Sequence, residues 1–327
     1  MNDVAREAGV SLKTVSRVVN AEPGVREETV ERVSTAIRRL RYRRDDIAST
    51  LRRRTTSASI GLVIEDLANP FYSLVARAVE DAASARQSVL ITGSSEGSAD
   101  LERQLIDTLL GRRVDGLIVV PEPIDHRFLT RDRDAGTPVV FLDRPPMGLD
   151  ADSVLLDNRG GARAAVGHLV AQGHRRIGLV GDPASLWTAA ERLSGYREAL
   201  AEAGIPEDPE LVRLGSRAVG DAERSTGELL ALPSPPTAIF AANNRNCVGV
   251  LRALDARRAS VALVGFDDFE LAEVLGVSVV SYDPAALGTL AARRLYARVD
   301  GLAAPAAQQV LATRLIVRRS SLVAPRA

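Results

Sequence analysis

The stretch "VAREAGVSLKTVSRVVN" (residues 4–20) contains two short amphipathic segments that are separated at Gly9. Ser11 precedes the second segment, and its hydroxyl is expected to accept a hydrogen bond from the backbone N–H of Thr14 and so begin a helix. Glycine at position 9 permits a sharp turn between two helices. Neither segment is long enough to be a stable helix alone. The pattern therefore predicts two helices that pack together and against a further element.

The apolar residues indicate how these helices pack. Val15, Val18 and Val19 lie on one face of the second helix, and Lys13 and Arg17 lie on the other. The flanking segments carry apolar residues at helical spacing: Val4, Ala5 and Ala8 before the turn, and Val30, Val33, Ile37 and Leu40 after it. Three short helices with a shared core form a helix-turn-helix unit, whose second helix fits the major groove of DNA. The alternative is a small helical hairpin with a charged surface.

The net charge of zero conceals an asymmetry between the two ends of the chain. Residues 1–57 carry a net charge of +5, and residues 58–327 carry −5. A basic first segment is typical of a head that binds a polyanion, although a solvated charged face remains an alternative.

The overall composition excludes several classes of protein. The 327 residues include no apolar run long enough to cross a bilayer, and no secretory signal is visible. A single cysteine, Cys247, excludes an internal disulfide, and the three histidines lack metal-ligand spacing. We therefore predict a cytoplasmic, nucleoid-associated protein without a metal or other cofactor.

Residues beyond 58 alternate between short apolar runs and amphipathic stretches of helical length. The runs include "IGLVI", "GLIVV", "PVVFL", "RIGLV", "VALVGF" and "VSVVSY". Near-continuous apolar strands that alternate with helices predict parallel sheets covered on both faces. With nine or more such runs, we expect two doubly wound α/β lobes rather than one.

The segment "DVAREAGVSLKTVSRVVN" closely resembles the N-terminal signature of lactose-repressor-type (LacI family) transcriptional regulators. The resemblance continues through "IGLVIEDLANPFYS", "VVFLDRP", "ERLSGY" and "VALVGFDD" and covers nearly the whole chain. It implies a helix-turn-helix domain over 1–43, a hinge helix and linker over 44–57, and a periplasmic-binding-protein-like core over 58–327. We expect the first lobe of the core at about 58–158 and 285–308, and the second at about 159–284 and 309–327.

The resemblance also implies a homodimer on double-stranded operator DNA, with a hinge-helix leucine wedged into the minor groove. The DNA-binding candidates lie in the second helix and the hinge: Ser11, Leu12, Lys13, Thr14, Ser16, Arg17, Asn20, Ala48 and Leu51. Ordinary linker packing is the alternative for Leu51.

A small-molecule effector is expected between the two lobes, since ligands of open parallel sheets bind at the carboxyl ends of the strands. Polar residues follow several predicted strands there, namely Glu65, Asp66, Asp143, Arg144, Asn243 and Asp267. Carried over by motif, the effector contacts are Asn69, Phe71, Tyr72, Asp143, Arg192, Asn243 and Asp267. Acids, an arginine and an asparagine suit the hydroxyls of a sugar. Helix-start core residues and strand-end caps are the alternatives for several of them. Trp187 lies near Arg192, either in the pocket wall or on the lobe surface.

Two departures from the family pattern bear on the effector. Asn244 stands where relatives usually have aspartate, and Arg217 falls near the position of an aromatic that often lines the pocket. An arginine there suits an acidic or phosphorylated ligand.

The sequence thus predicts an effector-controlled transcriptional regulator, a repressor that responds to a sugar or sugar derivative. A regulator of the same family that responds to a purine, a nucleoside or an acidic ligand is one alternative, and a solute-binding protein is another. An enzyme is not predicted, because the common catalytic templates are missing; Lys13 is the only lysine, which excludes a phosphate-binding Gly-Lys loop.

Overall fold

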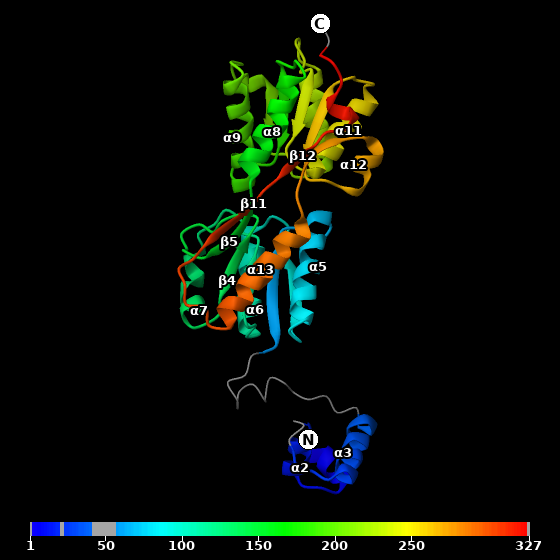
Figure 1. Ribbon diagram of the computed structural model, residues 1–327, viewed down its shortest axis with the longest axis vertical. Helices are drawn as coiled ribbons and strands as arrows, with labels where there is room; N and C mark the ends of the chain where they lie inside the picture. The colour runs from blue at the N-terminus through cyan, green and yellow to red at the C-terminus, as the bar shows by residue number, and fades with distance from the viewer. Residues whose placement is uncertain (1, 20–22, 41–56, 326–327) are drawn as a thin grey trace. The chain divides into compact units, whose positions relative to one another are not determined.

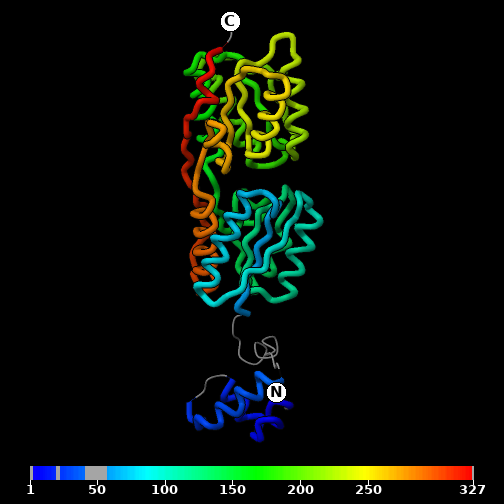
Figure 2. The backbone as a smooth tube through the Cα atoms, turned by 90° about the vertical axis from the view of Figure 1, so that its right-hand side faces the viewer, coloured from blue at the N-terminus to red at the C-terminus, as the bar shows by residue number. Residues whose placement is uncertain are grey.

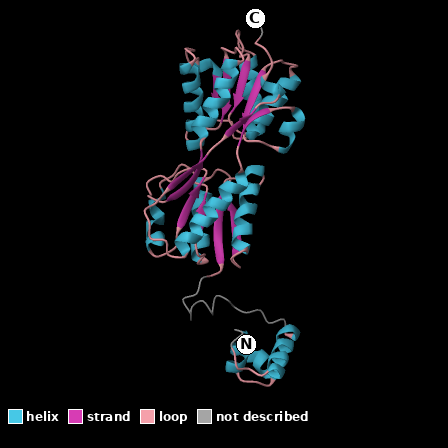
Figure 3. Ribbon diagram, in the orientation of Figure 1, coloured by secondary structure: helices cyan, strands magenta, loops and turns pink. Residues whose placement is uncertain are grey.

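The computed structural model describes residues 2–19, 23–40 and 57–325. The chain forms two compact units, Met1–Ser57 and Ala58–Ala327, drawn in Figures 1 and 3. The predicted residues Asn20, Ala48 and Leu51 lie outside the described residues.

The first unit is a three-helix bundle of α1 (Asn2–Ala8), α2 (Leu12–Val19) and α3 (Glu27–Arg39). The left-handed backbone of Gly9 (φ 61°) ends α1, and Ser11 Oγ accepts a 3.1 Å hydrogen bond from Thr14 N, as predicted. The buried core consists of Val4, Ala8, Val15, Val33 and Ala36.

The predicted packing face of α3 is only partly correct. Val30 is 36% exposed and Leu40 is 41% exposed, whereas Val33 and Ala36 are buried. The reason is length: α1 and α2 have seven and eight residues and α3 has 13, so the shorter helices cover only its middle.

The first lobe of the second unit is built on a six-stranded parallel sheet of order β11-β5-β4-β3-β1-β2. Its strands are β1 (Ser59–Ile64), β2 (Val89–Ser94), β3 (Leu117–Val119), β4 (Val139–Leu142), β5 (Asp152–Leu156) and β11 (Gln308–Leu311). Its helices are α5 (Pro70–Ser84), α6 (Ala99–Gly111), α7 (Thr130–Asp134) and α13 (Pro284–Val299), with a 3-10 turn at His126–Leu129. Ile60 and Leu62 pack in the core beneath α5 and α13, and Val63 packs on the opposite face with residues of α6, so both faces of β1 are buried.

The second lobe repeats this strand order as β12-β10-β9-β8-β6-β7. Its strands are β6 (Ile177–Gly181), β7 (Val212–Leu214), β8 (Ala238–Ala241), β9 (Ala262–Phe266), β10 (Ser278–Ser281) and β12 (Arg314–Ile316). Its helices are α8 (Asn158–Ala171), α9 (Trp187–Glu202), α10 (Val219–Leu230), α11 (Asn244–Ala256) and α12 (Glu270–Leu275), with 3-10 turns at Pro209–Leu211 and Arg319–Ser321. The prediction of two doubly wound parallel sheets is confirmed, except that β12 pairs antiparallel with β10.

The chain passes between the lobes three times, after β5, β10 and β11 (Figure 2). The last crossing follows Leu311, because β11 pairs with β5 of the first sheet. The crossing predicted at about residue 308 falls at the start of β11, and the chain leaves the first lobe only at the end of this strand. Three crossings bring the carboxyl ends of the central strands of both sheets to one interlobe space. Among the described residues, every helix is too short or too polar to span a membrane.

Candidate functional site

The second helix of the first unit presents polar and cationic side chains. Ser11 and Lys13 are exposed, and Leu12 is 48% exposed although it is apolar. Thr14, Ser16 and Arg17 are half-buried. The guanidinium of Arg17 donates a 2.6 Å hydrogen bond to the carbonyl of Pro23, so it is turned toward the loop before α3. The face of α2 opposite Val15 is therefore the candidate DNA-contacting surface.

The second unit has a polar cavity between its lobes. All seven residues predicted to contact an effector line it: Asn69, Phe71, Tyr72, Asp143, Arg192, Asn243 and Asp267. About 50 Å³ is left open between its side chains. Binding pockets for small molecules usually measure about 300–1,000 Å³. A ligand of sugar size therefore requires the lobes or their side chains to move apart.

Strand ends position two of the acids in equivalent ways. Asp143 follows β4 with φ 68°, and Asp267 follows β9 with φ 69°. Each donates its backbone N–H to the next strand of its sheet, at 2.9 Å to Val154 O and 3.0 Å to Val280 O. The left-handed backbone is unusual for residues other than glycine, although aspartate tolerates it. It turns both carboxylates into the cavity at the carboxyl ends of the sheets.

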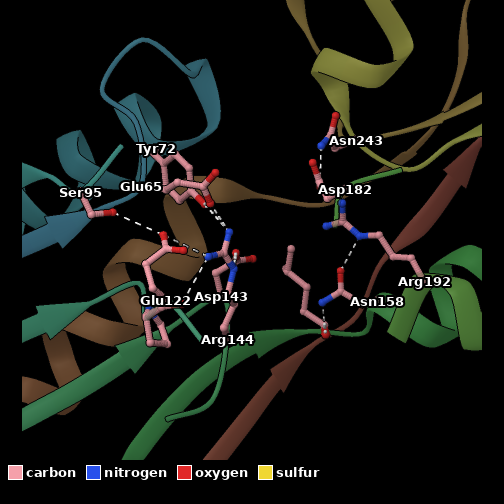
Figure 4. Close-up of polar contacts among 12 residues, drawn as sticks. Glu65, Tyr72, Ser95, Glu122, Asp143, Arg144, Asn158, Asp182, Arg192 and Asn243 are labelled. Atoms are coloured by element: carbon pink, nitrogen blue, oxygen red, sulfur yellow. Dashed lines mark hydrogen bonds and ion pairs between the residues drawn. The ribbon is translucent and has the colours of Figure 1, made fainter. Parts of the chain in front are cut away.

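Arg144 is the centre of the wall formed by the first lobe (Figure 4). Its guanidinium forms an ion pair with Glu65 and lies 3.7 Å from Glu122 Oε1 and 3.6 Å from Asp143 Oδ2. The hydroxyl of Tyr72 donates to Glu65 Oε2 at 3.3 Å. Three acids thus share one buried arginine in this wall.

Arg192 holds the wall formed by the second lobe together. Its Nε donates a 2.7 Å hydrogen bond to Asn158 Oδ1, and its Cζ lies 3.8 Å from the centroid of the Phe266 ring. The carboxylate of Asp267 lies 3.8 Å from the guanidinium and accepts a 2.7 Å hydrogen bond from the hydroxyl of Tyr282.

Asn243 has two roles at the start of α11. Its side-chain oxygen caps the helix by accepting from Asn246 N at 2.7 Å, and its Nδ2 donates to Asp182 Oδ2 at 2.6 Å. Asn69 caps α5 in the first lobe in a similar way, accepting from Phe71 N at 3.1 Å. The two cavity asparagines are therefore both caps and wall residues.

Burial changes the protonation of several cavity groups. It raises the pKa of Asp143 to about 6 and that of Asp182 to about 6. It also raises the pKa of the Tyr72 and Tyr282 hydroxyls, which therefore remain hydrogen-bond donors at neutral pH. At pH 7 the two aspartates act mainly as acceptors, and below about pH 6 they become donors.

Two contacts join the lobes directly. Asn244 Nδ2 donates a 2.9 Å hydrogen bond to Asn69 Oδ1, and Arg245 forms an ion pair with Asp66. Burial alone would raise the pKa of Asp66, but hydrogen bonds from Ala68 N and Arg245 hold it below its ordinary value. The α11 N-terminus therefore makes contact across the cavity with the segment between β1 and α5.

Four residues of the cavity wall were not predicted from the sequence: Asp182, Thr188, Arg245 and Tyr282. Asp182 and Tyr282 directly follow β6 and β10, so the same strand-end pattern could have found them. Thr188 and Arg245 lie in the first turns of helices and carry no comparable signal. Trp187 is half-buried, and its neighbour Thr188 lines the cavity in its place.

A helix-turn-helix unit with an exposed lysine on its second helix, followed by a two-lobed α/β body around a polar cavity, is the architecture of a DNA-binding transcriptional regulator. Comparison with known proteins agrees with this class. Residues 1–45 match the model of bacterial regulatory proteins of the lacI family, and residues 166–321 match that of the periplasmic binding protein-like domain.

The similarity extends over the whole chain. It is 33% identical to the HTH-type transcriptional regulator GalR of Escherichia coli (strain K12), over 99% of this chain and 96% of GalR. The lac repressor dimer bound to operator and the anti-inducer ONPF aligns with a TM-score of 0.84 and 29% identity, over 98% of both chains. The transcriptional regulator CelR in its cellobiose complex aligns with a TM-score of 0.74 and 32% identity, over 97% of this chain and 98% of that one. The chain belongs to the lacI family of bacterial regulatory proteins.

Proposed function

We propose that this regulator is a repressor that binds operator DNA through α2, in the cytoplasm and at the nucleoid. Leu12 and Lys13 at the exposed start of α2 are the candidates for contact with base edges. Ser11, Thr14, Ser16, Arg17 and Asn20 are candidates for contact with bases or phosphates, and Ala48 and Leu51 are candidates for the minor groove. The net charge of +5 over residues 1–57 supports attraction to the phosphate backbone.

We propose that a sugar or sugar derivative binds in the interlobe cavity and controls operator affinity. The observation that carries this proposal is the meeting of all seven motif-derived residues in one polar cavity. Carboxylates and asparagine oxygens accept from sugar hydroxyls, while arginine and asparagine nitrogens donate to them. Three aromatic side chains complete the cavity: Phe71 packs edge-on against Tyr72 and Tyr282, with centroids 4.8 and 5.9 Å away.

We propose that the regulator acts as a homodimer, since helix-turn-helix dimers place two recognition helices on two operator half-sites. Four large apolar side chains remain exposed on α5 and α12: Leu74, Leu271, Val274 and Leu275. The two helices border one groove of about 620 Å³. Leu74 lines this groove, while the other three apolar side chains lie on exposed positions of α12; exposed apolar side chains in such numbers are typical of a protein interface. The substitution Leu271→Glu is expected to shift the sedimentation coefficient from that of a dimer toward that of a monomer.

For the effector to control operator affinity, it must bind two arrangements of the lobes with different affinity. The open space of about 50 Å³ supports a closed arrangement in this structure, from which a ligand of sugar size must open the cavity. The two alternatives are less well supported. A solute-binding protein would need no DNA-binding helix. For an enzyme, the cavity acids would have to be arranged around a nucleophile, but they form ion pairs with arginines.

A thermal-shift screen of neutral sugars, sugar acids, sugar phosphates and nucleosides tests the effector site. A ligand at about 100 times its dissociation constant stabilises the folded protein by roughly 2.7 kcal/mol. The thermal shift caused by each ligand found is then measured in the cavity variants Asp267→Asn and Arg192→Gln and in the exposed control Asp255→Asn. We expect the thermal shift caused by the ligand to be lost in both cavity variants and retained in the control. Retention in all three would place the ligand elsewhere.

A further inference from the structure

Arg217 lies at one end of the interlobe cavity, in the loop between β7 and α10 of the second lobe. It faces Gly97, in the loop between β2 and α6 of the first lobe. Gly97 has a left-handed backbone (φ 72°), and a Cβ added there would overlap Arg217 Nη1. The absence of a side chain at position 97 therefore leaves the space that the guanidinium occupies.

The other arginines of the cavity wall are paired with acids. Arg144 pairs with Glu65, Arg192 lies 3.8 Å from Asp267 Oδ1, and Arg245 pairs with Asp66. The guanidinium of Arg217 has no hydrogen-bond or ion-pair partner within residues 2–19, 23–40 and 57–325. It is the cavity cation that remains available to a ligand.

Two polar groups of the first lobe, Ser95 and Glu122, bond to each other. Ser95 belongs to the same loop as Gly97, and its hydroxyl donates to Glu122 Oε1 at 3.4 Å. The same oxygen lies 3.7 Å from Arg144 Nη1 (Figure 4). Burial raises the pKa of Glu122, and the positive charges of Arg144 and, more weakly, Arg217 oppose this rise, so Glu122 interacts electrostatically with Arg217 from its buried position.

The cavity thus has two chemically different parts. Asp143, Asp182, Asp267 and Asn243 offer acceptors suited to hydroxyl groups, and Arg217 offers five N–H donors suited to a carboxylate or phosphate. We propose that the effector is a polyhydroxylated anion, a sugar acid or a sugar phosphate, whose charged group binds Arg217. This proposal rests on the proposed function, because it assumes that the effector occupies the interlobe cavity.

Arg217 is an exposed residue, so the competing interpretation is that it is a solvated surface arginine whose guanidinium packs on Gly97. The two interpretations differ in ligand preference. If Arg217 binds the charged group, a sugar acid or sugar phosphate binds more tightly than its neutral parent. If it is only a surface residue, charge on the ligand gives no advantage, and the acids of the cavity disfavour an anion.

The test uses matched ligands and matched variants of the full chain. Isothermal titration calorimetry compares glucose with glucuronate and glucose 6-phosphate, galactose with galacturonate and galactose 6-phosphate, and ribose with ribose 5-phosphate. Each ligand is titrated into the wild type, Arg217→Gln, Arg217→Lys and the control Arg224→Gln. Arg224 is an exposed arginine of α10 that does not line the cavity.

We expect at least one anion to bind the wild type more tightly than its neutral parent. Arg217→Gln should lower the affinity for that anion by about tenfold to a hundredfold, because hydrogen bonds to a charged group are lost. The affinity for the neutral parent should not change. Arg224→Gln should have no effect. Comparing uronates with sugar phosphates shows whether the charged group that Arg217 binds is a carboxylate or a phosphate. Arg217→Lys should retain more affinity for a phosphate than for a carboxylate, which arginine binds through two parallel hydrogen bonds.

Three outcomes overturn the proposal: no anion binds, the neutral parent binds as tightly as its anions, or Arg217→Gln weakens parent and anion equally. The proposed function fails in a different way. It fails if the bound ligands are unaffected by Asp267→Asn and Arg192→Gln, whereas a neutral sugar lost in both variants leaves the proposed function intact and removes only the role of Arg217.

Discussion

The side-chain amide of Asn244 donates a 2.9 Å hydrogen bond to Asn69 Oδ1 and so joins the second lobe to the first. The same oxygen of Asn69 accepts from Phe71 N and begins α5. Beside this contact, Arg245 forms an ion pair with Asp66. Both contacts are made by the first residues of α11. They hold the first residues of α11 against the first lobe, across the cavity.

We expect the double substitution Asn244→Ala and Arg245→Ala to shift the lobes toward an open arrangement. A part-exposed ion pair and one hydrogen bond together contribute about 1–2 kcal/mol, which is roughly a tenfold change in the closed-to-open ratio. Small-angle X-ray scattering should show a larger radius of gyration for the variant. Arg252→Ala, an exposed position on the same helix, is the control. An unchanged radius would mean that these contacts do not set the balance.

Stability should depend on pH through the buried cavity acids. The pKa of Asp143 and that of Asp182 are raised to about 6 in the folded protein, above the ordinary value of 3.8. The folded state therefore keeps protons that the unfolded state releases between about pH 4 and pH 6. The stabilising contribution is fully present below pH 4 and is lost as the pH rises to 6.

The substitution Asp143→Asn should remove part of this dependence. Asparagine tolerates the left-handed backbone and stays neutral, so the variant's free energy of unfolding should fall less between pH 4 and pH 6 than that of the wild type. Urea denaturation at several pH values measures this difference. Asp255→Asn, at an exposed position on α11, should retain the slope of the wild type. Equal slopes for wild type and Asp143→Asn would contradict the raised pKa.

Lys13 and Arg53 should contribute differently to DNA binding. Lys13 is exposed at the start of α2, so Lys13→Ala should change which bases are preferred, at a cost of about 1–3 kcal/mol for the preferred site. Arg53 belongs to the basic run of residues 52–54, which lies outside the described residues, and we expect it to contact phosphate. Arg53→Ala should therefore weaken binding to all sites alike and reduce the slope of affinity against salt concentration by about one. Operators selected from random DNA and then measured by fluorescence anisotropy at several salt concentrations test this. Equal effects across the panel would exclude this division of roles.

Two helical glycines offer a matched test of packing between α8 and α9. A Cβ at Gly195 would overlap the carbonyl oxygen of Arg159 and lie 2.9 Å from Ala162 Cβ, whereas a Cβ at Gly167 meets nothing within 4 Å. Gly195→Ala should therefore destabilise the second unit by about 1–3 kcal/mol as the helices are forced apart. Gly167→Ala should stabilise it by up to about 1 kcal/mol, because alanine favours a helix. Chemical denaturation of both variants measures the contrast, and changes of the same sign would contradict it.

The features that were predictable from the sequence depend on local chemistry. The cap at Ser11 needs only a hydroxyl three residues before the N–H of Thr14. The positions of Asp143 and Asp267 follow from their place directly after apolar strands. Motif resemblance adds Arg192, which lies in the interior of a helix and has no strand-end signal.

The features that were missed depend on distant partners. The exposure of Val30 and Leu40 reflects the lengths of the helices that cover α3, not their own spacing. The antiparallel pairing of β12 and the late crossing after Leu311 reflect which strand edge is available at the end of the chain. No pattern within either segment specifies that choice.

By itself, the sequence determined the helix-turn-helix unit and the two doubly wound lobes, because periodicity, capping and strand ends act over a few residues. Its resemblance to a family identified seven of the residues that line the interlobe cavity. Only the tertiary structure decided that Asn244 contacts Asn69, that Arg245 pairs with Asp66, and that Arg217 lies over Gly97. Each of these relationships joins residues more than a hundred positions apart. They form only when the three chain crossings bring the ends of the two sheets together. The contacts between the lobes therefore exist only in the folded protein and cannot be read from either segment alone.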